Sequence, residues 1–208
     1  MTESKAVLPR RVVVLASGSG TNLQVLMDDP SPSWSVVGVI TDRPGVRALE
    51  RAATAGIDTV VVEWSDYGSR PEFTAALCDV IDGMGADLIV LAGFMRILDA
   101  VAIERFPNKI INVHPSLLPA FPGAHAVRDA LNYGAKVTGV TVHFVDEHLD
   151  HGPIIRQEAV PVLAGDDEDS LHGRIQIEEH RLLPAVVTAL ARNEYEVTGR
   201  TVKGKVTA

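Results

Sequence analysis

The chain has 208 residues, of which 46% are hydrophobic and 22% charged, a composition that excludes coiled-coil, collagen-like and low-complexity proteins. Its formal net charge of −8 argues against nucleic-acid and anionic-membrane partners. There is no signal-peptide core, and no apolar run approaches the roughly 20 residues that span a bilayer. Its one cysteine, Cys78, allows no internal disulfide, so we expect a cytoplasmic protein. From the length we expect a single domain over residues 1–208.

The first half of the chain alternates short apolar runs, rich in Val and Ile, with stretches of helical spacing. Continuous apolar runs are typical of strands that are buried on both faces of a parallel sheet. The predicted strands cover residues 11–16, 36–40, 59–62, 87–92 and 109–113. The predicted helices cover residues 22–28, 46–55, 70–84 and 99–105. This order predicts a Rossmann-like α/β fold with helices on both faces of the sheet.

The second half breaks this rhythm. Two strand-like runs, residues 136–145 and 153–162, are separated by too few residues for a crossover helix, so we expect them to pair antiparallel. The sheet is then mixed, with a parallel N-terminal part and an antiparallel C-terminal pair. The longest helix should cover residues 169–192, where Pro184 favours a kink. A small hairpin is expected around residues 198–199.

A glycine-rich turn, SGSGTN at residues 17–22, lies between the first strand and the first helix. Its backbone N–H groups can bind an anion such as a phosphate. A dinucleotide site would need a third glycine where Leu23 stands, although Asp42 lies about where a ribose-binding acid is expected. A plain strand-to-helix turn, with Thr21 or Asn22 capping the helix, is the alternative interpretation.

The end of the fifth strand has the pattern Asn112-Val113-His114, followed by Pro115 and Pro119. Side chains two apart in a strand share a face, so the amide and the imidazole should point into one crevice at the carboxyl ends of the strands. Such a pair suits a carbonyl that becomes a tetrahedral oxyanion. The alternative is a histidine that is satisfied by a neighbouring carbonyl group.

The loop at residues 146–152 holds three carboxylates and two histidines. We weigh a metal site at His148 and His151, a solvated acidic loop, and one carboxylate that reaches back to orient His114. The sequence alone does not select the acid. A covalent mechanism is disfavoured, because Cys78 lies in a predicted helix and Ser19 and Ser116 lack a nucleophile-elbow context.

Six motifs together resemble the folate-dependent phosphoribosylglycinamide formyltransferases of purine synthesis. They are SGSGTNLQ (17–24), LAGFMRIL (91–98), NVHPSLLP (112–119), VHFV (142–145), LDHGP (149–153) and EH (179–180). Methionyl-tRNA formyltransferases and formyltetrahydrofolate deformylases share part of this core, but they carry an additional tRNA-binding or regulatory domain for which we expect no room here.

The resemblance implies that Asn112, His114 and Asp150 are catalytic, with Asp150 stabilising protonated His114. It implies a ribonucleotide site at Gly20, Thr21, Asn22, Gln176, Ile177, Glu178 and Glu179. It implies that 10-formyltetrahydrofolate, as cosubstrate, meets Arg70, Met95, Arg96, Ile97, Leu98, Asn112, Asp146, Glu147, His148, Leu149 and Asp150. No metal is expected.

The expected activity is formyl transfer to the amine of phosphoribosylglycinamide, with a phosphate-binding half over residues 1–100 and a catalytic, folate-binding half over residues 101–208. Two departures from the family pattern stand out: His151 replaces a common second glycine, and residues 120–123 contain no basic side chain. The alternatives are a deformylase, a nicotinamide oxidoreductase and a non-catalytic phosphosugar-binding regulator. We expect a monomer or a homodimer.

Overall fold

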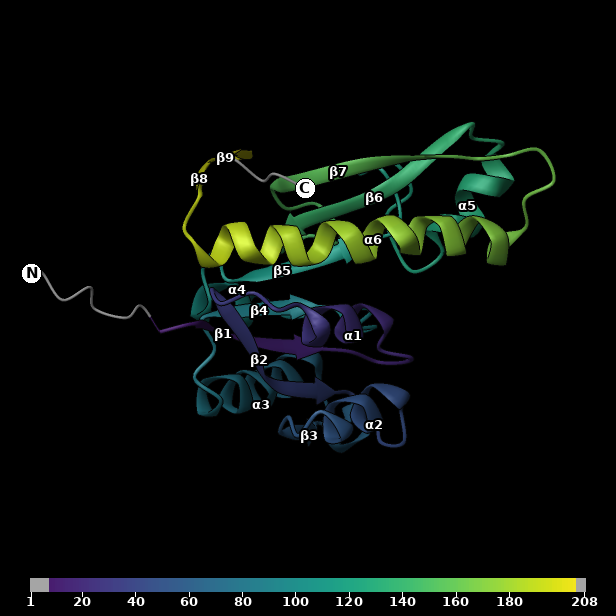
Figure 1. The fold of residues 1–208 in the computed structure, drawn as a ribbon. Coiled ribbons are helices and arrows are strands. Elements are labelled where there is room, and N and C mark those ends of the chain that lie inside the picture. The colour runs from purple at the N-terminus through teal and green to yellow at the C-terminus, as the bar shows by residue number, and fades with distance from the viewer. Residues whose placement is uncertain (1–7, 205–208) are drawn as a thin grey trace, which may run out of the picture.

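The computed structural model describes residues 8–204, and within this range nine strands form one mixed sheet (Figure 1). The strand order is β3-β2-β1-β4-β5-β6-β7-β9-β8. The strands are β1 (Arg10–Leu15), β2 (Trp34–Thr41), β3 (Thr59–Val61), β4 (Leu88–Leu91), β5 (Ile110–His114), β6 (Val137–Phe144), β7 (Ile154–Pro161), β8 (Tyr195–Thr198) and β9 (Thr201–Gly204). Strands β1 to β5 pair parallel, and β6 pairs antiparallel with both β5 and β7. The predicted mixed α/β fold is confirmed.

Helices cover both faces of the sheet, as predicted. They are α1 (Thr21–Asp28), α2 (Arg47–Thr54), α3 (Arg70–Gly83), α4 (Ala100–Arg105), α5 (Ala126–Tyr133) and α6 (Glu168–Ala191), with a single 3₁₀ turn η1 (Trp64–Asp66). Local capping explains where the longer ones begin. Ser69 accepts a hydrogen bond from the Glu72 N–H at the start of α3, and Asp167 and Ser170 form a capping box at α6.

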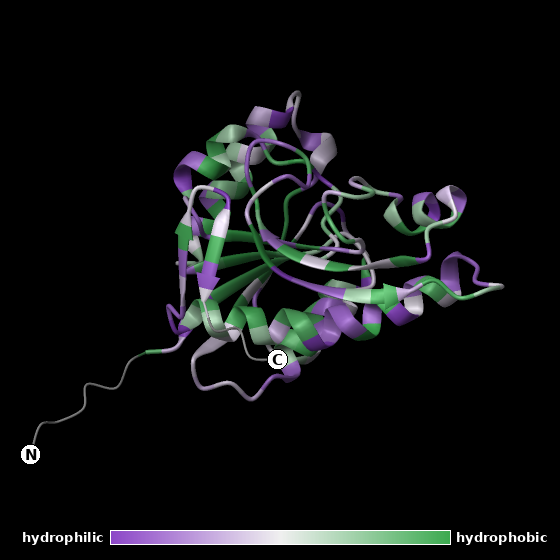
Figure 2. Cartoon of the chain, turned by 90° about the horizontal axis from the view of Figure 1, so that it is seen from above, coloured by the Kyte–Doolittle hydropathy of each residue, from purple (hydrophilic) through white to green (hydrophobic). Residues whose placement is uncertain are grey.

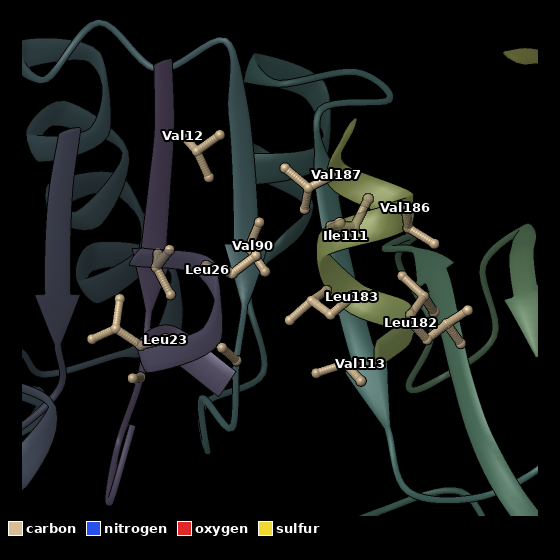
Figure 3. Packing of buried hydrophobic residues seen from close by; sticks show 14 of the residues in the cluster. Val12, Leu23, Leu26, Val90, Ile111, Val113, Leu182, Leu183, Val186 and Val187 are labelled. Carbon is tan, nitrogen blue, oxygen red and sulfur yellow. The ribbon is translucent and has the colours of Figure 1, made fainter. Parts of the chain in front are cut away.

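The alternation of side chains along the strands builds two cores. Val12 and Val14 pack with α1, α2 and α6, whereas Val13 and Leu15 pack with α3 and α4. Figure 3 shows the first core, where leucines of α1 and α6 lie over strand valines and Ile111. Figure 2 shows the apolar strands at the centre of the molecule. Cys78 is buried in the second core, and this burial raises the pKa of its thiol to about 11.

All predicted element boundaries lie within two residues of those observed, but three features were not foreseen. Strand β6 pairs with β5, α5 forms between β5 and β6, and β9 pairs with β7 through Thr201 and Ile154. The hairpin expected around residues 198–199 is present as β8 and β9. Helix α6 continues through Pro184 as one element.

The strand order reverses direction at β1. From β1 the chain runs outward through β2 and β3, and it then returns to add β4 and β5 on the other side. In open α/β sheets ligands bind outside the carboxyl ends of the strands at such a switch point. No helix among the described residues has both the length and the hydropathy that a membrane crossing requires.

Candidate active site

A cavity of about 620 Å³ opens at the carboxyl ends of β1, β4 and β5. Its walls come from the glycine turn, the loop after β4, the end of β5, the loop after β6 and the first turns of α6. This volume suits one or two small organic molecules. The sequence analysis expected a crevice at the carboxyl ends of the strands, where the cavity lies.

Three side chains meet at the centre of this cavity. Asn112 and His114 project from the same face of β5, and Asp150 reaches them from the loop after β6. One oxygen of Asp150 lies 3.4 Å from His114 Nδ1, and the other accepts a hydrogen bond from Asn112 Nδ2 at 3.3 Å. The N–H of Gly123 donates to the Asp150 carboxylate at 2.7 Å. Asp150 is therefore the carboxylate that contacts His114.

His114 is buried, and protein oxygens lie beside its ring. His114 is only 4% exposed, and its Nε2 lies 2.9 Å from the carbonyl oxygen of Phe121. A carbonyl oxygen only accepts, so Nε2 must carry a hydrogen, while Nδ1 faces the Asp150 carboxylate. Both ring nitrogens thus face acceptor oxygens. An imidazolium can donate on both sides, which suits a group that stabilises negative charge or supplies a proton.

His143 is a neighbour of this centre to which the sequence analysis assigned no role. In the register of β5 and β6 it lies directly opposite Asn112. Its Nδ1 lies 2.8 Å from the Phe144 carbonyl oxygen and must donate to it, which leaves Nε2 as an acceptor 3.2 Å from Asn112 Nδ2. Burial lowers the pKa of His143 and so favours this neutral ring. Only the pairing of β5 with β6 could have revealed the contact.

The backbone that carries Asp150 is tightly constrained. Asp150 has a φ of 49°, in the left-handed region, and two residues later Gly152 packs against the Phe144 carbonyl oxygen so closely that a Cβ would lie 1.9 Å away. Only glycine fits at residue 152.

Burial alone would raise the pKa of Asp146, but its hydrogen bonds with His151 and the His148 N–H outweigh burial and lower it.

The glycine turn presents an uncapped helix start to the cavity. Gly20 is the N-cap of α1, with a φ of 69° and no side-chain cap, so the capping by Thr21 or Asn22 in the alternative interpretation is not found. Arg51 of α2 donates to the Ser19 carbonyl oxygen at 2.9 Å. Because the C=O and N–H of a peptide unit point in opposite directions, this bond turns the Gly20 N–H away from α2. The turn is therefore free to bind an anion.

Helix α6 meets the start of α1 through two side-chain hydrogen bonds. Gln176 donates to Thr21 Oγ1 at 2.9 Å, and Asn22 donates to the buried Glu179 at 2.9 Å. Both α6 residues line the cavity. The Oδ1 of Asn22 is buried and has no partner among the described residues, which leaves an acceptor for a ligand donor.

Ile177 and Glu178 lie outside the cavity. Ile177 is exposed, and Glu178 accepts a hydrogen bond from Arg181. The reason is helical spacing: residues three apart share a face, whereas the two residues between Gln176 and Glu179 point elsewhere. Their roles stay predictions.

The residues expected at the folate site are mostly brought together. Met95, Arg96, Ile97 and Leu98 line one wall of the cavity, and residues 146–150 line the opposite wall. Met95 and Ile97 are 59% and 50% exposed, so this end offers apolar surface. Arg70 does not line the cavity; its guanidinium lies 3.6 Å from Asp99, which follows Leu98 directly. A folate contact of Arg70 also stays a prediction.

Two other polar groups bear on the alternatives. Asp42, the acid considered for a dinucleotide ribose, is buried and paired with Arg96 and Arg43, while Leu23 is fully buried in the core. Neither supports a dinucleotide site. Asp146, His148 and His151 form a group of potential metal ligands at the rim, with ligand atoms within 4.8 Å of one another. Arg200, however, donates to the ring and carbonyl group of His151 and opposes a cation there.

The sequence is similar to a known family and to named proteins. The formyl transferase family matches residues 10–187. The phosphoribosylglycinamide formyltransferase of Mycobacterium tuberculosis (strain ATCC 25618 / H37Rv) is 49% identical over 195 residues, which cover 93% of this chain and 90% of that protein. The trifunctional purine biosynthetic protein adenosine-3 of Gallus gallus is 45% identical over 190 residues, which cover 90% of this chain and 19% of that protein.

A solved structure is also similar over nearly the whole chain. The crystal structure of glycinamide ribonucleotide transformylase 1 from Symbiobacterium toebii superposes with a TM-score of 0.93 at 44% identity. The match covers 97% of this chain and 99% of that one.

Proposed function

Because the chain belongs to the formyl transferase family, we propose that it transfers the formyl group of 10-formyltetrahydrofolate to the amine of phosphoribosylglycinamide, a step of purine biosynthesis. The observation that carries this proposal is the Asp150 carboxylate, which contacts both Asn112 and His114 at the centre of the cavity. An amide donor and an imidazolium beside one carboxylate suit acyl transfer through an oxyanion. The reaction uses the side chains alone, without a metal.

The two ends of the cavity suit the two substrates. The uncapped start of α1 at Gly20, Thr21 and Asn22 suits the phosphate, since free N–H groups there attract an anion without any basic side chain. Gln176 and Glu179 then suit the ribose and glycinamide groups, with the free Asn22 Oδ1 as an acceptor. We call this region the ribonucleotide end.

The opposite end suits a folate. Its apolar surface at Met95, Ile97 and Leu149 can cover a flat aromatic system, because all three side chains are exposed and line the cavity. Asp146 and Asp150, on the wall that carries Leu149, offer carboxylate and backbone groups for the polar edge of the ring. We call this region, formed by residues 93–98 and 145–150, the folate end.

The transfer step follows from this placement. The amine nitrogen attacks the formyl carbon, and a new C–N bond forms while the carbonyl electron pair moves onto oxygen. In the free site Asn112 Nδ2 faces Asp150 and His143, and on substrate binding it turns one N–H to that oxyanion, which the charge of protonated His114 also stabilises. The bond from the formyl carbon to N10 of the folate then breaks, its electron pair stays on N10, and N10 takes the proton that the new ammonium group loses. Holding both substrates side by side supplies much of the rate by proximity.

Two assays separate the alternatives. Tetrahydrofolate release is followed with and without phosphoribosylglycinamide, and transfer requires that release depend on the acceptor and that the N-formyl product accumulate. Equal release without the acceptor would instead indicate a deformylase. A parallel binding assay with NAD and NADP tests the oxidoreductase alternative.

We place the reaction in the cytoplasm, where a free buried thiol such as Cys78 is stable. That the protein is a monomer or a homodimer stays a prediction.

A further inference from the structure

Asp42 is a buried carboxylate that the proposed reaction does not use. It follows the last residue of β2, is 2% exposed and does not line the cavity. Burial alone would raise its pKa, but hydrogen bonds from Arg43, Ser17 and Arg96 outweigh burial and lower the pKa. Asp42 is therefore an anion held by three donors. A buried charge of this kind is costly unless its partners are fixed in place.

Of the two arginine partners, Arg96 makes the shorter contact, and it belongs to the folate end. Its Nε donates to Asp42 Oδ2 at 2.7 Å, and its guanidinium carbon lies 5.0 Å from the ring centroid of Trp64. The Trp64 ring packs edge-on against Phe73, and Phe73 stacks on Phe94. The Arg96 side chain, which was expected to meet folate, thus directs its Nε to Asp42 while the residue still lines the cavity.

Ser17 connects the same carboxylate to the backbone of the loop. Its hydroxyl donates to Asp42 and accepts a hydrogen bond from the Met95 N–H at 2.9 Å. Asp42 thereby holds two successive residues, one through its main chain and one through its side chain. Phe94 stacks on Phe73 and Arg96 is bonded to Asp42, while the exposed apolar side chains of Met95 and Ile97 line the cavity.

We propose that Asp42 is a positioning residue for the folate end: through Arg96 and Ser17 it fixes residues 93–98 so that Met95 and Ile97 form the apolar wall. This inference rests on the proposed function for the identity of the ligand. It predicts a selective effect, because Asp42 contacts none of the residues of the ribonucleotide end. A general structural role would instead weaken both ends equally.

The test compares Asp42→Ala with Asp42→Asn and with Arg43→Met. Asp42→Ala should raise the folate KM about tenfold, the loss of roughly 1.4 kcal/mol of binding, while the ribonucleotide KM stays within about twofold. Asp42→Asn keeps an oxygen that can accept from Arg96 and should recover most of the loss. Arg43→Met is the matched control, because Arg43 pairs with Asp42 but its side chain is 46% exposed and holds no part of the loop.

Tryptophan fluorescence gives a readout that does not depend on turnover. The chain has two tryptophans, and only Trp64 contacts Arg96, whereas Trp34 lies at the far end of β2. Asp42→Ala should shift the Trp64 emission, and Asp42→Asn should restore it. If Asp42→Ala does not fold, Arg96→Met removes the same contact from the loop side and should give the same selective rise in the folate KM.

Three outcomes would overturn the inference: an unchanged folate KM in the folded variants, an equal rise of both KM values, or an unchanged Trp64 emission. The failure of the proposed function looks different. In that case the unmodified protein shows no acceptor-dependent release of tetrahydrofolate, while the Trp64 emission still reports whether Asp42 holds Arg96 in place.

Discussion

The two ends of the cavity are built in different ways. At the ribonucleotide end, helix starts and side-chain hydrogen bonds fix the polar groups, as in the pairs Gln176–Thr21 and Glu179–Asn22. At the folate end, loops present apolar side chains such as Met95 and Leu149 to solvent. The proposed catalytic side chains Asn112 and His114 lie on β5.

This difference reflects what each ligand needs. A phosphate is bound by N–H groups that must point at it to donate hydrogen bonds, so rigid helices suit that end. A flat aromatic system is held mainly by apolar contact, which loops can provide when side-chain contacts hold them in place. The Asp42–Arg96 ion pair is such a contact. Substitutions at the two ends should therefore separate by substrate, and substitutions at the centre should affect both.

The largest effect is expected at the centre. Asp150→Asn nearly preserves shape but removes the charge beside His114, and kcat should fall by roughly 10²–10⁴. His114→Asn should cause a comparable loss. The double variant should lose much less than the product of the two, because the residues act as a unit. Steady-state rates of the four proteins give this coupling directly.

Rates alone do not exclude a folding defect, so each variant also needs a thermal unfolding curve and a ribonucleotide binding constant close to those of the unmodified protein. If the loss of kcat in the double variant equals the product of the two single losses, Asp150 and His114 act independently. That result would contradict a shared role and would exclude Asp150 from the catalytic centre.

The next effect should be confined to the ribonucleotide end. A Cβ at Gly20 would lie 2.9 Å from Ala48, so Gly20→Ala must displace the turn, and we expect the ribonucleotide KM to rise at least about tenfold. Gly45→Ala is the matched control: Gly45 has the same φ of 69° but open space around it. Both variants carry the left-handed strain of roughly 1–2 kcal/mol. A similar ribonucleotide KM in the two folded variants would show that strain alone acts.

Most of the fold followed from local sequence patterns, for physical reasons. Strands buried on both faces must be continuously apolar, and the crossover helices must carry an apolar stripe, so β1 to β5 and α1 to α4 were predictable. The pairing of β6 with β5 was not, because an antiparallel partner leaves no mark on the residues of either strand. Helix α5 is short, and its sequence follows a proline-rich exit that favours a loop.

The candidate site divides in the same way. Asn112 and His114 were predictable as neighbours because strand period places them on one face. The residues alone left the choice of acid open; the resemblance implied Asp150, and the structure brings its carboxylate to His114. The contact of His143 with Asn112 depends on the register of the β-sheet. The contact of Arg96 with Asp42 joins two residues that are distant in sequence. Such long-range contacts are invisible to periodicity.

A smaller effect is expected at the folate end. Met95→Ala and Ile97→Ala remove exposed apolar surface, so the folate KM should rise about three- to tenfold at unchanged melting temperature. Leu163→Ala is the matched control, because Leu163 is 53% exposed but does not line the cavity. Initial rates at varied folate concentration measure the effect. A rise in the ribonucleotide KM instead would contradict the assignment of the two ends.

The smallest effect concerns His143, beneath the centre. Burial lowers its pKa in the folded protein, while the unfolded chain keeps a value near 6.5. Below about pH 6.5 the unfolded chain therefore binds more protons, so stability should fall as the pH falls through this range.

His143→Gln keeps an acceptor for Asn112 but removes this proton, so its stability should fall less steeply between pH 7 and pH 5. One proton contributes a slope of at most about 1.4 kcal/mol per pH unit. Urea unfolding at several pH values measures both slopes, and the constant difference between the proteins at pH 8 accounts for any packing change. Parallel curves down to pH 5 would mean that His143 takes up a proton in the folded protein as readily as in the unfolded chain, and the neutral acceptor assigned to it would then be wrong.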